Sequence, residues 1–209
     1  MKIISLSNRR KGLTAILFQD GSECLIDSEL VSIRNLKDGS VVVDLNELKF
    51  ESDCKRAKSR ALWYLSRADH SKKALWQKLI KGGFSKEAVD LAVERMEELG
   101  LLDDEKLAIR LTEYYLSQNM SRKEAYHKLL LKGIQSSLAK EIVFCHQDDE
   151  TEKIKDLISV KYASKLEGEE NVKKVYAALV RKGFSFTDIR KALREYSEEL
   201  ENSEEDYGV

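Results

Sequence analysis

The chain has 209 residues, of which 35% are charged and 42% apolar, and its formal net charge is −1. No apolar run approaches the roughly 20 residues that a membrane-spanning helix needs, and the basic run from Arg9 to Lys11 argues against a signal peptide. The three cysteines, Cys24, Cys54 and Cys145, stand far apart, which argues against a disulfide framework or a zinc site and indicates a reducing cytoplasm.

The charges are segregated along the chain. Between Cys54 and Lys86 there are ten Lys or Arg residues and a single acid, Asp69. Between Lys173 and Arg194 there are seven basic residues and one acid, whereas the residues after Arg194 include seven acids and no base. Such segregation favours a polyanionic or an acidic partner.

Residues 1–45 predict a small β-rich element of three or four strands. The runs "KIISLS", "GLTAILF", "ECLID" and "DGSVVVD" are β-branched or alternate in polarity. "QDGS" separates the second run from the third, and Asp-Gly is typical of a hairpin turn. "DSELVSIRNL" predicts a short helix capped by Asp27 or Ser28.

Apolar residues recur with helical spacing from Asp44 to about residue 200. A long helix is expected from Asp44 to Ser66, because Asp44 and Glu47 have the spacing of a capping box. Further helix starts are predicted at polar residues that precede apolar runs: Ser71, Ser85, Asp103, Ser121, Asn171 and Ser185. Helix ends are predicted where glycine adopts a positive φ at little cost, at Gly83, Gly133 and Gly183.

One unit occurs three times at intervals of 50 residues, as "SKKALWQKLIKGGFS", "SRKEAYHKLLLKGIQ" and "NVKKVYAALVRKGFS". Its apolar positions match in all copies, and a further helix precedes each copy. The predicted fold is mainly α, with three tandem three-helix repeats at residues 46–100, 101–147 and 148–200 that stack in an elongated, curved array. Residues 201–209 predict an acidic flexible tail, and the protein is expected to be a monomer.

The sequence contains no set of residues that is typical of catalysis or of metal binding. His146 falls on a core position of its repeat, whereas His70 and His127 are expected at the surface. Asp103 and Asp104 open a helix, where acids interact favourably with the helix dipole. We therefore expect no catalytic residue, no metal and no cofactor.

Basic residues recur on the polar face of the repeated helix. A solvated helix face explains any single copy, but repetition favours a surface that binds nucleic-acid phosphates or an acidic protein. Trp63 and Tyr64 have the chemistry to stack on bases, whereas Trp76 is expected in the core. The predicted binding residues are Arg67, Lys72, Lys73, Lys78, Lys81, Arg122, Lys123, Lys128, Lys132, Lys173, Lys174, Arg181 and Lys182.

Three blocks of residues carry a resemblance to a known family. "ALWYLSRADHSKKALWQKLIKGGFS", "ELGLLDDEKLA" and "MSRKEAYHKLLLKGI" occur in the order found in the RecX family of bacterial recombination regulators. The resemblance covers about residues 55–200 and implies tandem three-helix repeats. It also implies a non-enzymatic protein that binds the RecA recombinase along its nucleoprotein filament and inhibits ATP hydrolysis and strand exchange.

Two alternatives stand beside this interpretation. One is a protein that binds single- or double-stranded DNA without RecA, and the other is a helical scaffold for another protein. The acidic tail also suggests an autoinhibitory contact with the basic helices that precede it.

Overall fold

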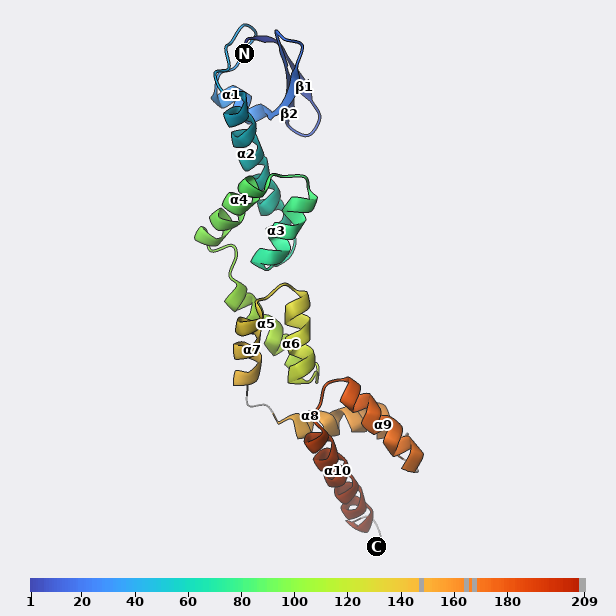
Figure 1. The fold of residues 1–209 in the computed structure, drawn as a ribbon. Coiled ribbons are helices and arrows are strands. Elements are labelled where there is room, and N and C mark those ends of the chain that lie inside the picture. The colour runs from blue at the N-terminus through green and yellow to red at the C-terminus, as the bar shows by residue number, and fades with distance from the viewer. Residues whose placement is uncertain (147–148, 164–165, 167–168, 207–209) are drawn as a thin grey trace. The chain divides into compact units, whose positions relative to one another are not determined.

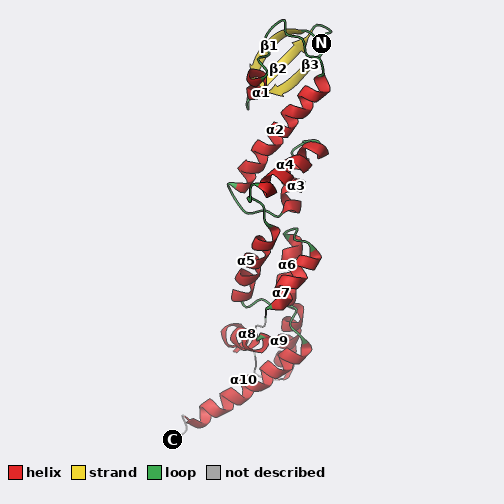
Figure 2. Ribbon diagram, turned by 90° about the vertical axis from the view of Figure 1, so that its left-hand side faces the viewer, coloured by secondary structure: helices red, strands yellow, loops and turns green. Residues whose placement is uncertain are grey.

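The computed structural model describes residues 1–146, 149–163, 166 and 169–206. The chain divides into two compact units, Met1–Asp103 and Asp104–Val209. Figure 1 follows the chain through its elements, and Figure 2 shows the strands of the described residues at the N-terminal end. The predicted class, a mainly helical protein with a small β-rich element at its start, is confirmed.

Unit 1 begins with an antiparallel sheet in the order β1-β2-β3. The strands are β1 (Ile3–Arg9), β2 (Leu13–Phe18) and β3 (Glu23–Asp27), and α1 (Ser28–Ile33) follows them. Ile16, Phe18 and Ile26 are completely buried on one face, since alternate residues of a strand share a face. The strand predicted at "DGSVVVD" is only a bridge between Lys2 and Val41, because the chain soon turns at Asp44 to begin a helix.

The long helix α2 (Leu45–Leu65) belongs to two hydrophobic cores of unit 1. Asp44 caps it as predicted, since its carboxylate accepts bonds from the amides of Asn46 and Glu47. Leu48 packs into the core of the sheet, whereas Ala57 and Ala61 pack into the core of the first repeat. One continuous helix therefore joins the N-terminal module to the repeats.

Three consecutive groups of three helices follow the sheet. Repeat 1 contains α2, α3 (Lys72–Lys81) and α4 (Lys86–Glu98). Repeat 2 contains α5 (Asp104–Ser117), α6 (Arg122–Leu131) and α7 (Ser136–Cys145). Repeat 3 contains α8 (Glu150–Leu157) with the π-helical turn η1 (Ile158–Tyr162), α9 (Glu169–Arg181) and α10 (Phe186–Asp206).

Each repeat has a hydrophobic core of its own, built from equivalent positions. Leu79, Leu129 and Leu179 are all completely buried. The predicted glycine turns are present in every copy, with φ of 86° at Gly83, 88° at Gly133 and 90° at Gly183. The repeat of 50 residues is therefore a repeat of three-dimensional structure.

In the first two copies, the aromatic residue joins the two helices of the repeated pair by a hydrogen bond. The Trp76 indole donates a hydrogen bond to Asp90 on α4 at 2.7 Å. The Tyr126 hydroxyl lies 2.8 Å from the Ser136 hydroxyl on α7. All three aromatic residues are half-buried and pack against the cores of their repeats, so Trp76 lies at the border of its core and not within it.

Three further predicted features differ from the structure. Asn171 does not cap α9, because that helix already begins at Glu169. His146 is half-buried and does not occupy a helical core position, because α7 ends at Cys145. The backbone of α10 continues helically to Asp206, into the acidic segment predicted as a tail, and residues 207–209 lie outside the described residues.

Within unit 2, the start of α6 abuts the turn that follows α9. The Ser121 hydroxyl is completely buried, accepts a bond from the amide of Glu124 and donates one to the Lys182 carbonyl at 2.6 Å. A side-chain carbon at Gly183 would lie 2.8 Å from that hydroxyl and 3.1 Å from Cβ of Lys123. Glycine is therefore required there both for its positive φ and for space.

A second set of contacts joins repeats 2 and 3. The amide of Arg122 donates to Oε1 of Glu150 at 2.6 Å, and Nε of Arg122 lies 3.4 Å from the same oxygen. Nη1 of Arg122 also donates to the His146 carbonyl at 3.1 Å. Glu150 retains only 8% of its exposure, so this charge is almost desolvated and depends on Arg122.

We expect Gly183→Ala to destabilise unit 2 more than Gly83→Ala destabilises unit 1. Both alanines adopt a positive φ, which costs about 1–2 kcal/mol, but no atom lies within 4 Å of the added carbon at Gly83. The close approach to Ser121 adds at least about 1 kcal/mol at Gly183. Urea denaturation followed by circular dichroism measures both losses, and equal losses would contradict the close contact.

We also expect Glu150→Gln to lower the free energy of unfolding by about 1–3 kcal/mol, because a charge-assisted, largely buried pair with Arg122 is lost. Glu124→Gln is the matched control, since its pair with Lys128 spans 3.9 Å at the helix surface. That control is expected to change stability by less than about 0.5 kcal/mol. The same urea titration tests both variants, and similar losses would refute a special role of Glu150.

Candidate basic binding surface

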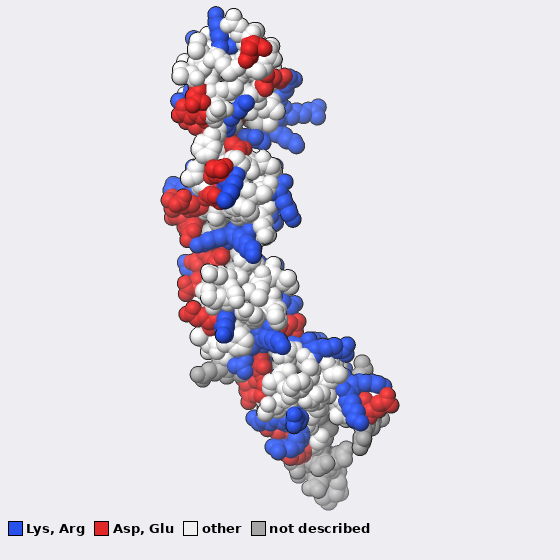
Figure 3. All heavy atoms as spheres, viewed as in Figure 1, with Lys and Arg blue, Asp and Glu red and all other residues white. Residues whose placement is uncertain are grey.

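The predicted basic residues lie on the polar faces of the repeated helices, but their surroundings differ. Most are exposed, whereas Lys72, Arg122, Lys128 and Lys182 are half-buried. Figure 3 shows Lys and Arg side chains over both units, interrupted by patches of acids. The contacts of each residue therefore decide which charges are accessible to a partner.

In unit 1, the four lysines of α3 fall into two classes. Lys72 forms an ion pair with Glu97 on α4. Lys78 lies 5.0 Å from the centre of the Tyr64 ring and 3.4 Å from Nε2 of His70. Lys73 and Lys81 are exposed. The last two are thus the more accessible charges of this helix.

An exposed tryptophan near the end of α2 lies close to two guanidinium groups. Trp63 is 44% exposed, and Cζ of Arg67 and of Arg60 lie 4.5 Å and 5.4 Å from its ring centre. The Tyr64 ring meets the indole edge-on, with centroids 5.2 Å apart. We call Arg60, Trp63 and Arg67 the Trp63 clamp.

The sequence prediction included Arg67 among the basic binding residues and named Trp63 as a residue able to stack on bases, but it missed Arg60. The spacing of Arg60 contains the missing signal, since a residue three before Trp63 within the same helix lies on the same side of that helix. In the part of the chain that the structure describes, neither guanidinium has a carboxylate partner within ion-pairing distance. Both charges therefore remain available to an anion beside an aromatic surface.

In unit 2, the basic residues of α6 are divided in a different way. Arg122 is held by Glu150 and by the His146 carbonyl, so it joins two repeats. Lys128 lies 3.9 Å from Glu124 and 5.5 Å from the centre of the Tyr115 ring. Lys123 is exposed at the start of the helix, so it is the residue of these three that is most accessible to a partner.

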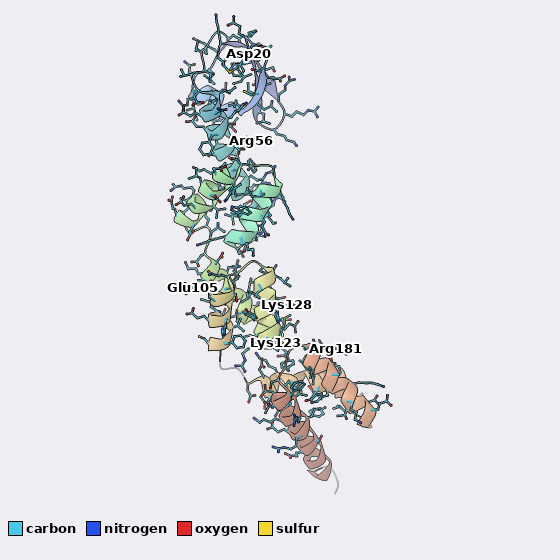
Figure 4. The ribbon with its side chains drawn as sticks, in the orientation of Figure 1. Asp20, Arg56, Glu105, Lys123, Lys128 and Arg181 are labelled. Atoms are coloured by element: carbon cyan, nitrogen blue, oxygen red, sulfur yellow. The ribbon has the colours of Figure 1, made fainter. Side chains whose placement is uncertain are left out.

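The contact between α6 and the turn after α9 brings basic residues of two repeats together. Lys123 lies beside Gly183, and Arg181 and Lys182 immediately precede that glycine. Figure 4 labels Lys123 and Arg181 on the two sides of this contact. We call Lys123, Arg181 and Lys182 the junction cluster, because like charges gathered at one place create a positive potential that attracts anions.

The two remaining predicted residues of α9, Lys173 and Lys174, lie in its first half and not in the junction cluster. Both are exposed, and Lys174 pairs with Glu170 at 3.2 Å, a contact with little energetic value at the surface. On α10, exposed Arg190 and Arg194 line a further hollow of about 380 Å³ that the sequence prediction did not include among the binding residues. The basic surface is therefore broader than the repeated motif.

The titratable groups of the described residues show no arrangement typical of an active site. Burial raises the pKa of the Cys24 and Cys54 thiols, which disfavours the reactive thiolate. Among the described residues, no group of His, Cys, Asp and Glu has the geometry to hold a metal ion. The same part of the chain has no helix with the length and apolarity needed to cross a bilayer.

The chain is similar to known proteins along most of its length. The family model "RecX, first three-helix domain" matches residues 57–96. The regulatory protein RecX of Clostridium tetani is 26% identical over 201 residues, which covers 91% of each chain. That of Chlorobium phaeobacteroides is 30% identical over 150 residues and covers 68% of this chain and 95% of the relative.

Solved structures show the same fold. A crystal structure of regulatory protein RecX superposes with a TM-score of 0.65 at 20% identity and covers 92% of this chain and 98% of the other. RecX from Lactobacillus salivarius gives a TM-score of 0.62 at 21% identity over 69% of this chain. The sequence resemblance is thus confirmed, and the chain belongs to the RecX family of regulatory proteins.

Proposed function

We propose that this protein binds the RecA recombinase in its filament on single-stranded DNA. It modulates, mostly by inhibition, the ATP hydrolysis, strand exchange and filament growth that RecA performs in recombination and DNA repair. The protein acts in the cytoplasm as a monomer and catalyses no reaction itself.

Membership in a family of regulatory proteins supports a regulatory role. The observation that carries the binding proposal is the junction cluster, where Lys123 of one repeat lies beside Gly183 of the next, which directly follows Arg181 and Lys182. Complementary charge raises the rate of association with an acidic protein surface or with a phosphate backbone. A recombinase filament on DNA contains both an acidic protein surface and a phosphate backbone. A repeat protein carries basic residues at regular intervals, which suits a filament whose subunits also repeat.

The first test uses a variant in which Lys123, Arg181 and Lys182 are each changed to Glu. Because reversed charges repel an anionic filament, we expect the concentration for half-maximal inhibition of the RecA ATPase to rise by about tenfold or more. Lys86, Lys140 and Lys161 are also exposed and lie outside the basic surface described above, so their change to Glu is a matched control of equal net charge.

We expect the control variant to inhibit nearly as well as the unmodified protein. If the unmodified protein at saturating amounts leaves ATP hydrolysis, strand exchange and filament lifetime unchanged, the proposal is wrong. If both variants lose inhibition equally, net charge and not the junction cluster determines binding.

The Trp63 clamp favours a second candidate function, direct binding to single-stranded DNA without RecA. An exposed indole provides a surface on which an unpaired base stacks, and Arg60 and Arg67 provide charges for the adjoining phosphates. Duplex DNA keeps its bases stacked on one another, so a clamp of this kind prefers single strands.

The two tryptophans of the chain permit a direct optical test. In a Trp76→Phe variant, Trp63 is the sole tryptophan, and we expect oligothymidylate to quench its fluorescence more strongly than duplex DNA does. Trp63→Ala should weaken binding by about 10- to 100-fold, the usual effect of losing one stacked base. Added salt should weaken binding in every variant, because phosphate contacts release counterions. Stacking on Trp63 would be excluded if oligothymidylate left the Trp63 fluorescence of the Trp76→Phe variant unchanged and if the Trp76→Phe and Trp63→Ala variants bound it with equal affinity.

A further inference from the structure

The N-terminal sheet has two outer edges, and one of them is closed. At the edge of β1, the amide of Ile3 donates to the Ser40 carbonyl and the amide of Gly39 donates to the Ile3 carbonyl. The amide of Leu6 donates to the Asp38 carboxylate at 3.1 Å. The backbone groups along the first half of β1 are therefore satisfied within the molecule.

The outer edge of β3 is open along part of its length. In the β2–β3 ladder, Phe18 bonds to Ser22 and Ser28 to Gly12, so the intervening even-numbered residues of β3 also bond to β2. The backbone N–H and C=O groups of Glu23, Leu25 and Asp27 consequently point away from β2. The amide of Asp27 reaches the Ser52 hydroxyl at 2.8 Å, which confirms this direction and closes one end.

Glu23 and Leu25 remain as the open segment of the edge. Their outward groups repeat at two-residue spacing, roughly 7 Å, which matches the spacing along another extended chain. Leu25 is 52% exposed, so an apolar side chain lies beside these unpaired groups. Proteins usually block such an edge, because it pairs readily with a further strand.

A hollow of about 810 Å³ adjoins this edge and determines which peptides fit it. It is lined by Arg9, Arg10, Leu13, Glu23, Cys24, Leu25 and Lys49. Arg9 lies 3.3 Å from Glu23 and neutralises it. Arg10 and Lys49 are exposed, and within the described residues neither has a carboxylate at ion-pairing distance.

We propose that the Glu23–Leu25 edge of β3 binds an extended acidic peptide of a partner protein as an additional strand. Main-chain hydrogen bonds to Glu23 and Leu25 supply affinity, as in other cases of strand addition. An apolar side chain of the peptide packs on Leu13 and Leu25, and its acidic neighbours meet Arg10 and Lys49. This role of the N-terminal module is independent of any effect on the recombinase.

The test uses the full chain without recombinase or DNA. The probe is a fluorescent peptide in which Val and Glu alternate, and a peptide in which Val and Lys alternate is its control. We expect the acidic peptide to bind with a dissociation constant between micromolar and millimolar, at least about tenfold more tightly than the basic peptide. Equal affinity for both peptides, or no binding of the acidic one, overturns the proposal.

Substitutions at the edge distinguish strand addition from simple charge attraction. Leu25→Pro removes an outward N–H without breaking the β2–β3 ladder and should abolish binding, because proline cannot donate to an added strand. Leu25→Thr keeps that N–H and should retain most of the affinity. The double variant Arg10→Glu/Lys49→Glu should weaken binding about tenfold or more. The double variant Lys2→Glu/Lys37→Glu, a control with the same change of net charge, should not weaken binding.

Hydrogen exchange gives an answer even if the proline variant does not fold. In the free protein, the amides of Cys24 and Ile26 should exchange slowly and that of Leu25 rapidly, and the acidic peptide should slow the exchange of Leu25. An unchanged Leu25 amide at saturating peptide overturns the proposal. So does a concentration-dependent dimer that Leu25→Pro abolishes, because the edge would then bind a second copy of this chain.

Discussion

The buried hydrogen bond from Ser121 to the Lys182 carbonyl fixes how two repeats of unit 2 meet. The serine that caps α6 also binds the backbone at the end of α9, 61 residues further along the chain. Glycine must follow that carbonyl, because any side chain there would collide with the serine. The positions of Lys123, Arg181 and Lys182 beside one another depend on this contact.

Equivalent basic residues have different roles because their glutamate partners lie in different places. Lys72 and Arg122 occupy the same position of their repeats, and both pair with a glutamate. Glu97 is a surface residue on a helix of the same repeat, whereas Glu150 is nearly buried and begins the next repeat. Repetition of sequence thus produces a recurring frame, within which single substitutions decide whether a basic residue pairs within its own repeat or with the next one.

The sequence predicts most of the fold because its signals are local. Apolar spacing, the cap at Asp44 and the glycine turns depend on neighbouring residues, and the structure contains all of them. Asn171 and His146 were misplaced because apolar spacing does not fix a helix end to a single residue: α9 begins at Glu169 and α7 ends at Cys145. The candidate surface was less predictable. That Arg122 pairs with Glu150, and that Lys123 meets Gly183, depends on contacts across 28 and 60 residues of chain, which no periodicity encodes.

The helix α2 has a mechanical consequence for unit 1. Its first turns are packed in the core of the sheet and its last turns in the core of repeat 1, with no loop between them. A helix that is packed at both ends transmits rotation, so a force that rotates the sheet also rotates repeat 1. The sheet and repeat 1 are therefore rigidly coupled through α2. A protein that binds the sheet would also constrain the orientation of α3 and α4.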